Sequence, residues 1–119
     1  MNSRQTGQNG EEEAVQFLAR LGYQILARNF STPQGELDIV VQDKNTLVFV
    51  EVKTRASMAF GGPMAAVTPA KQKRMTLTAV QYIKARSPKF DSIRFDVVCV
   101  LPDRIEHVIN AFTPERTTL

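Results

Sequence analysis

The chain has 119 residues, of which 43% are hydrophobic, and carries a formal net charge of +3 with a pI of about 9.3. This length allows one domain with a modest core and excludes two separate domains. The mildly basic charge is compatible with a polyanionic partner. Cys99 is the single cysteine, so an internal disulfide is excluded and a reducing compartment is expected.

The chain shows neither of the two common signals for a membrane or an export pathway. No apolar run approaches the roughly 20 residues that a helix needs to cross a membrane. The N-terminal "MNSRQTGQNG" lacks the apolar stretch of a signal peptide. We therefore expect a cytoplasmic protein without a membrane partner.

Hydrophobic periodicity, turn residues and helix caps indicate a single domain over residues 1–119. In chain order we expect a disordered polar start over 1–9, a helix over 11–22, strands over 23–30, 36–42 and 46–54, a mobile loop over 55–67, a helix over 69–86, and strands over 92–101 and 104–112. The order α-β-β-β-α-β-β predicts an α/β fold with a central mixed β-sheet flanked by helices.

The first two of these elements have predicted buried faces. Helical spacing in the element over 11–22 predicts a buried stripe of Ala14, Phe17, Leu18 and Leu21. The strand that follows is expected to present Tyr23, Ile25 and Ala27 on one face.

The segment "GELDIVVQDKNTLVFVEVKTR" has the pattern of a β-hairpin with "KN" as its two-residue turn. In this register Asp38 faces Glu51 directly. Glu36 likewise faces Lys53, and the alternation of side chains puts all four on one polar face. The opposite face is expected to be apolar core, formed by Leu37, Ile39, Val41, Val48, Val50 and Val52. A slip of one residue would bury the charges, so the register is well specified.

Two facing carboxylates repel each other unless they share a proton, a basic partner or a divalent cation. The Cβ atoms of Asp38 and Glu51 would lie roughly 4.5 to 5.5 Å apart in this register. Mg²⁺ prefers one or two carboxylates together with water and phosphate oxygens. Lys53 projects from the same face, where it could orient or help deprotonate a metal-bound water. Metal, water and phosphate are the parts needed for phosphodiester hydrolysis.

The same residues have a purely structural interpretation, which the hairpin pattern leaves open. A salt-bridge ladder would pair Glu36 with Lys53 and Asp38 with Arg55, and such surface pairs stabilise little. Two features favour a functional site. The acids outnumber the lysine locally, and "EVK" interrupts the otherwise strongly apolar strand "LVFVEV".

A series of short motifs resembles a known family. Over roughly residues 10 to 112 they are, in order, "GEEEA", "GYQILARNF", "GELDIV", "LVFVEVKTR", "FGGP", "AVTPAKQKR" and "RFDVV". The pair "GELD" and "EVK" resembles the signature of PD-(D/E)xK nucleases. The whole series is similar to the YraN-like family of uncharacterised bacterial proteins. This resemblance implies a restriction-endonuclease-like core related to archaeal Holliday-junction-resolving enzymes.

The resemblance also implies a set of site residues. In that superfamily two acids and a backbone carbonyl bind Mg²⁺ (or Mn²⁺), and these ligands match Asp38, Glu51 and the carbonyl of Val52. The motif lysine matches Lys53. A catalytic acid of the first helix matches Glu11, although the helix dipole also favours an acid in a first turn.

Two positions near these residues leave alternatives open. Glu36 has either an accessory role beside the metal or a plain ion pair with Lys53. Leu37 stands where the superfamily motif has a proline, which is a departure that other members of the superfamily share.

Five polar residues are expected to contact nucleic acid beside the site. They are Arg55 after the motif strand, and Lys71, Gln72, Lys73 and Arg74 in the first turns of the second helix. Basic side chains and the N–H groups of a helix start could hold phosphates, giving affinity without sequence readout. The alternative is the solvated face of an ordinary helix.

The remaining candidates are weaker. His107 is the single histidine, which excludes a zinc site or catalytic dyad built on histidines, and it is interpreted as an ordinary strand residue. Arg94 and Asp96 alternate on one face of their strand, so we expect them to pair with neighbours, with an accessory role as the alternative.

The sequence thus predicts an endonuclease, dependent on Mg²⁺ or Mn²⁺, that binds and hydrolyses DNA with selectivity for branched or other structures as a further option. The alternatives are a non-catalytic nucleic-acid-binding module and a protein-interaction domain on the same fold. A homodimer is compatible with the resemblance, because related resolvases work as dimers.

Overall fold

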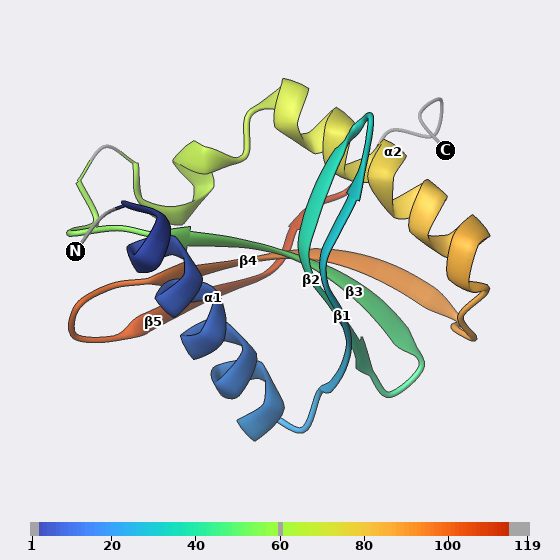
Figure 1. The fold of residues 1–119 in the computed structure, drawn as a ribbon, viewed down its shortest axis with the longest axis horizontal. Helices are drawn as coiled ribbons and strands as arrows, with labels where there is room; N and C mark the ends of the chain where they lie inside the picture. Colours follow the sequence, from blue (N-terminus) through green and yellow to red (C-terminus); the bar gives the residue numbers. More distant parts are fainter. Residues whose placement is uncertain (1–2, 60, 115–119) are drawn as a thin grey trace.

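The computed structural model describes residues 3–59 and 61–114 (Figure 1). Outside the described residues lie 1–2, Phe60 and 115–119. Parts of the expected disordered start, of the expected mobile loop and of the expected domain over 1–119 therefore fall outside them. The elements in chain order are α1 (Ser3–Arg20), β1 (Gln24–Thr32), β2 (Gly35–Asp43), β3 (Thr46–Thr54), the 3-10 helix η1 (Gly62–Ala66), α2 (Pro69–Arg86), β4 (Ser92–Val100) and β5 (Ile105–Phe112). The predicted order α-β-β-β-α-β-β is confirmed, with η1 added inside the expected loop.

The strands form one mixed sheet in the order β1-β2-β3-β4-β5. β3 and β4 run parallel, whereas the other neighbouring strands are antiparallel. A parallel pair needs a crossover connection, and α2 supplies it. The predicted α/β fold class, a central mixed sheet flanked by helices, is therefore confirmed.

α1 covers one face of the sheet. Ala14 and Leu18 are fully buried there, against side chains of β2, β3 and β4 that comprise Ile39, Val41, Val48, Val50, Val98 and Val100. Leu21, predicted to extend this stripe, is 50% exposed because α1 ends at Arg20 and the chain turns toward β1. The helix also begins at Ser3, so the described residues of the tail expected over 1–9 are helical.

α2 covers the opposite face and begins as the sequence predicted. Pro69 is its first residue, and the Thr68 hydroxyl accepts a hydrogen bond from the Lys71 N–H at 3.2 Å, which caps the helix. Its buried side chains Met75, Ala79 and Tyr82 form a second core cluster with side chains of the sheet, which are Leu37, Val40, Leu47, Phe49 and Phe95. None of the helices in the described part of the chain is long and apolar enough to span a membrane.

The middle of the β2–β3 hairpin is buried on both faces, which corrects the expectation of one apolar and one polar face. Val40, Leu47 and Phe49 alternate with the apolar residues assigned to the core, yet they are fully buried beneath α2. A continuous apolar run such as "LVFV" is typical of a central strand that is covered on both sides. The polar face is therefore confined to one end of the hairpin.

β1 is irregular, and this changes the direction of its side chains. Its register with β2 shifts between Ile25 and Ala27. Ile25 consequently packs with Tyr23 against the α1 cluster, as predicted, whereas Ala27 packs against the α2 cluster, so its placement on the same face was wrong. Asn29 has a positive φ of 54°, a conformation that asparagine adopts more readily than most residues.

Candidate active site

The candidate site lies where β2 and β3 separate. The predicted hairpin register is confirmed from the turn as far as Ile39–Val50, and Figure 1 shows β1 and β2 turning away from β3. Asp38 and Glu51 are the next residues of the two strands. Here the Val52 N–H donates a hydrogen bond to Asp38 Oδ2 at 2.8 Å, so a side chain accepts from the backbone of the neighbouring strand.

Glu51 is a buried carboxylate that faces two lysines. Its side chain is only 4% exposed, Lys53 Nζ lies 3.5 Å from its Oε1, and Lys71 Nζ lies 3.3 Å from its Oε2. Lys53 comes from the same strand, whereas Lys71 comes from the first turn of α2. Among the described residues, neither ion pair of the alternative salt-bridge ladder is formed. Lys53 pairs with Glu51 instead of Glu36, and Asp38 makes no ion pair with Arg55.

Three acids gather from α1 and β2. The carboxylates of Glu11, Glu36 and Asp38 each offer an oxygen within 4.8 Å of the other two. With its amide nitrogen turned toward them, Asn29 donates to Glu11 Oε1 at 3.2 Å and to Glu36 Oε1 at 2.9 Å. Glu51 stands outside this group of three. The structure thus brings Glu11 and Glu36 close to Asp38.

The electrostatics of these acids reflect burial and mutual repulsion. Burial, followed by the charge of Glu51, raises the pKa of Asp38 to about 7, against the lowering effect of the Val52 hydrogen bond. Burial also raises the pKa of Glu11, with a further contribution from Glu36, although the Asn29 amide acts in the opposite direction. Both carboxyl groups therefore lie in surroundings that disfavour their negative charge.

The donor set fits a hard divalent cation. All the candidate ligands are oxygens, the type that Mg²⁺ and Mn²⁺ prefer. The four acids outnumber the two lysines that contact them, and the raised pKa of Asp38 indicates that more positive charge would be accommodated. The Val52 N–H contacts Asp38, so the backbone of Val52, whose carbonyl is the predicted third ligand, lies beside these acids.

The five predicted nucleic-acid contacts divide into two groups. Lys73, Arg74 and Arg55 are exposed, and Arg55 borders two cavities of about 210 and 290 Å³. Lys71 instead points inward to Glu51. Gln72 donates through its side chain to the Val67 carbonyl at 3.0 Å, so it fastens the start of α2.

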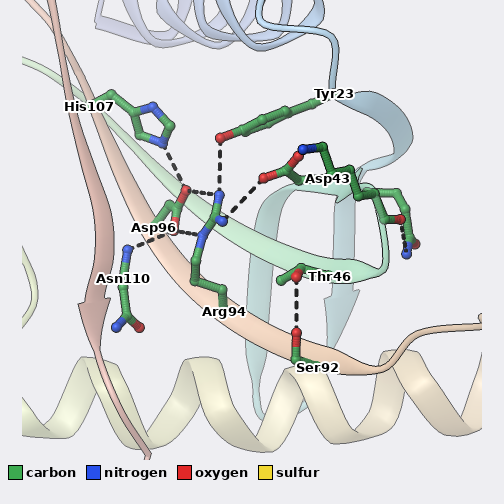
Figure 2. Close-up of polar contacts among 10 residues, drawn as sticks. Tyr23, Asp43, Thr46, Ser92, Arg94, Asp96, His107 and Asn110 are labelled. Atoms are coloured by element: carbon green, nitrogen blue, oxygen red, sulfur yellow. Dashed lines mark hydrogen bonds and ion pairs between the residues drawn. The ribbon is translucent and has the colours of Figure 1, made fainter.

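A second polar cluster, the Arg94 network, lies between β4, β5 and the connection from α1 to β1 (Figure 2). The fully buried Asp96 accepts from Arg94 Nε at 2.8 Å and Nη2 at 3.0 Å, and from the Asn110 N–H at 3.0 Å. His107 Nε2 lies 2.8 Å from the same carboxylate, and Arg94 donates to the Tyr23 hydroxyl at 3.1 Å. The predicted pairing of Arg94 and Asp96 with neighbours is thus found.

Two participants were missed in the sequence. His107 is a partner of Asp96 and was interpreted as an ordinary strand residue. Asn29 was missed at the candidate site, where its signal was the presence of an asparagine inside a strand, a position that disfavours it.

Residues 10–100 match the model of the uncharacterised protein family UPF0102. The chain belongs to this family. The match contains every acid and lysine of the candidate site, from Glu11 to Lys71. The YraN-like recognition made from the motifs is confirmed by this membership.

Relatives in this family match nearly the whole chain. A UPF0102 protein of Syntrophomonas wolfei is 47% identical over 114 residues, covering 92% of this chain and 99% of that protein. UPF0102 proteins of Caldicellulosiruptor saccharolyticus and Dictyoglomus thermophilum are 48% and 41% identical, covering 82% and 94% of this chain and 83% and 100% of their own lengths. The crystal structure of SSO0001 is similar with a TM-score of 0.49 and 16% identity, over 94% of this chain and 53% of that chain.

Proposed function

We propose that this UPF0102 protein is a Mg²⁺- or Mn²⁺-dependent endonuclease that hydrolyses phosphodiester bonds in DNA. The observation that carries the proposal is the position of Asp38 and Glu51 at the separating ends of β2 and β3, with Lys53 beside Glu51. The agreement between the observed order of elements and the nuclease core implied by the motifs supports it further.

The cation would be held by Asp38, Glu51 and the carbonyl of Val52, with Glu11 and Glu36 beside it. When bound, such a cation polarises a phosphoryl oxygen and lowers the pKa of a bound water. These residues suit it because their donors are hard oxygens and because burial and repulsion raise the pKa of Asp38.

The protein's own residues would then prepare the attack of water on phosphorus. Lys53, held beside Glu51, would donate a hydrogen bond to the water and orient it. Glu11, whose pKa burial raises, would be the carboxylate that accepts the proton that the water loses. The new oxygen–phosphorus bond forms as the bond to the leaving nucleotide oxygen breaks.

DNA as the substrate, and a homodimer as the active form, belong to this proposal. The net charge of +3 and the exposed Lys73, Arg74 and Arg55 suit a phosphate backbone. Contacts of this kind fix position without reading bases, which is consistent with recognition of DNA structure over sequence.

A cleavage panel tests the proposal. Linear, nicked, flapped and four-way DNA are incubated with Mg²⁺ or Mn²⁺ and wild-type protein, Asp38→Asn or Lys53→Ala. Both variants are expected to lose cleavage by about 100-fold or more. Asp91→Asn and Lys89→Ala make the same chemical changes at exposed positions and are expected to cleave like wild type.

The alternative functions give different results on the same panel. A non-catalytic nucleic-acid-binding module retains DNA in a gel shift with salt-dependent affinity, cleaves nothing, and keeps or gains affinity in Asp38→Asn. A protein-interaction domain neither cleaves nor retains DNA at low salt. Cleavage that survives Asp38→Asn would contradict the proposed site.

A further inference from the structure

Lys71 connects α2 to the buried carboxylate of Glu51. Its Nζ lies 3.3 Å from Glu51 Oε2, while Lys53 Nζ lies 3.5 Å from Oε1, so each oxygen faces an ammonium group. The Lys71 side chain is 26% exposed, whereas that of Glu51 is 4% exposed. The lysine therefore reaches from the protein surface to an acid that is almost inaccessible to water.

The backbone of Lys71 is fixed, but its side chain can move. The Lys71 N–H donates to the Thr68 hydroxyl, the Gln72 N–H donates to the Thr68 carbonyl at 2.9 Å, and the Gln72 side chain donates to Val67. These bonds hold the first turn of α2. The four-carbon side chain of lysine remains rotatable, so Nζ can leave Glu51 without any movement of the helix.

An ammonium group and a divalent cation compete for a carboxylate oxygen, because both need its lone pairs and they repel each other at such distances. Lys71 would therefore have to leave Glu51 Oε2 when that oxygen becomes a metal ligand. Two exposed basic residues, Lys73 and Arg74, follow it in the first turns of α2 and form the basic start of this helix. A released Lys71 would join them at the surface.

We propose that Lys71 couples the metal site to the nucleic acid. In the metal-free protein its ammonium group pairs with the Glu51 carboxylate. When a divalent cation binds, the side chain moves away and its ammonium group pairs with a phosphate of the DNA backbone. The inference rests on the proposed function. Because linkage is reciprocal, metal strengthens DNA binding through Lys71, and DNA strengthens metal binding to the same degree.

Metal affinity without DNA is the first measurement. Mn²⁺ is titrated calorimetrically into wild-type protein and Lys71→Gln, and the variant is expected to bind about 3- to 10-fold more tightly, as expected for loss of one partly exposed ion pair. Lys73→Gln removes the same charge from the same helix at an exposed position and is expected to match wild type. Lys71→Arg keeps the competing cation and is also expected to stay near wild type.

DNA affinity with and without metal is the second measurement. Four-way DNA is titrated with each protein in EDTA and in Ca²⁺, with intact DNA verified after the titration. The gain in affinity on adding Ca²⁺ is expected to be smaller in Lys71→Gln than in wild type. Lys73→Gln is expected to weaken binding equally in both solutions, which leaves the gain unchanged.

The outcomes separate this inference from the proposed function. If Asp38→Asn abolishes Mn²⁺ binding but Lys71→Gln binds Mn²⁺ no more tightly than wild type, the metal site stands and the role of Lys71 is overturned. If Mn²⁺ binding appears only in Lys71→Gln, the competition is supported. If neither wild type nor Lys71→Gln binds Mn²⁺, both the proposed function and the role of Lys71 fail. Thermal unfolding of each variant verifies that the compared proteins are folded.

Discussion

The carboxyl groups of Asp38 and Asp96 belong to the same sheet, yet the groups that surround them differ in kind. Burial acts to raise the pKa of Asp96, but hydrogen bonds from His107, Arg94 and Asn110 hold it below its ordinary value. Burial and the charge of Glu51 raise the pKa of Asp38 to about 7, and the Val52 N–H only partly offsets this. Donors from the protein outweigh the cost of burying the charge of Asp96, but they do not outweigh it for Asp38.

This difference separates a structural acid from a candidate functional one. A perturbed pKa alone does not separate the two kinds of acid, because structural ion-pair networks also perturb pKa values. The direction is informative here. Asp96 is stabilised in its charged form and joins β4 to β5, whereas Asp38 is disfavoured in its charged form at an end of the sheet where further acids gather.

The largest expected effect comes from Asp96→Ala. The change leaves the half-buried charge of Arg94 without its main partner, and losses from broken buried pairs are about 3–5 kcal/mol of unfolding free energy. Chemical denaturation at pH 7 measures it. Asp103→Ala, whose side chain is 72% exposed in the β4–β5 turn, is the matched control and is expected to cost about 0–1 kcal/mol. Equal losses in the two variants would contradict the structural role of Asp96.

Asp38→Asn is expected to have the opposite sign. The amide keeps an acceptor for the Val52 N–H and removes a charge that faces Glu51 and Glu11. In EDTA at pH 8, the free energy of unfolding should rise by on the order of 1–3 kcal/mol. The matched change Asp96→Asn should lower it, because it removes the charge that Arg94 contacts. Chemical denaturation of the two variants side by side makes the comparison directly.

The pH dependence follows from the same shift. A carboxyl group whose pKa rises from 3.8 to about 7 on folding binds its proton more tightly in the folded protein than in the unfolded chain. Its stabilising contribution is therefore complete below pH 4 and is lost as the pH rises to about 7. Wild type should show this decline and Asp38→Asn should lack it. Identical pH profiles for the two proteins would show that Asp38 titrates normally.

The order of elements was predictable because its signals are local. Thr68 and Pro69 mark the start of α2, "KN" marks the hairpin turn, and the register follows from a two-residue turn. The nearness of Asp38 and Glu51 follows from the same register, although the paired part of the hairpin ends one residue before them, at Ile39 and Val50. Both acids are counted from that turn along two adjacent strands.

The remaining contacts depend on how distant elements meet. The spacing within α2 shows which residues share a face, but it does not show how the helix is rotated over the sheet, so the approach of Lys71 to Glu51 could not be predicted. The irregular register of β1 has no clear mark in "QILARNF", and it decides where Asn29 points. His107 reaches Asp96 only through the pairing of β5 with β4.

The smallest of these effects is expected from Tyr23→Phe, which removes one hydrogen bond at the edge of the Arg94 network. Arg94 Nη2 donates to the Tyr23 hydroxyl at 3.1 Å, and the Arg94 Cζ lies 5.7 Å from the centre of the ring. Phenylalanine keeps the ring contact and loses the acceptor, so the loss should be about 0.5–1.5 kcal/mol of unfolding free energy.

Tyr82→Phe is the control for this change, because it removes a hydroxyl from a tyrosine whose ring packs on Phe30 and Phe49 in the other core cluster. It should cost less than Tyr23→Phe in the same denaturation experiment. Additivity then tests the network itself. In the Asp96→Ala background Arg94 is no longer held in place, so the further loss from Tyr23→Phe should shrink. An undiminished loss would mean that the Tyr23 hydroxyl stabilises the protein independently of Asp96.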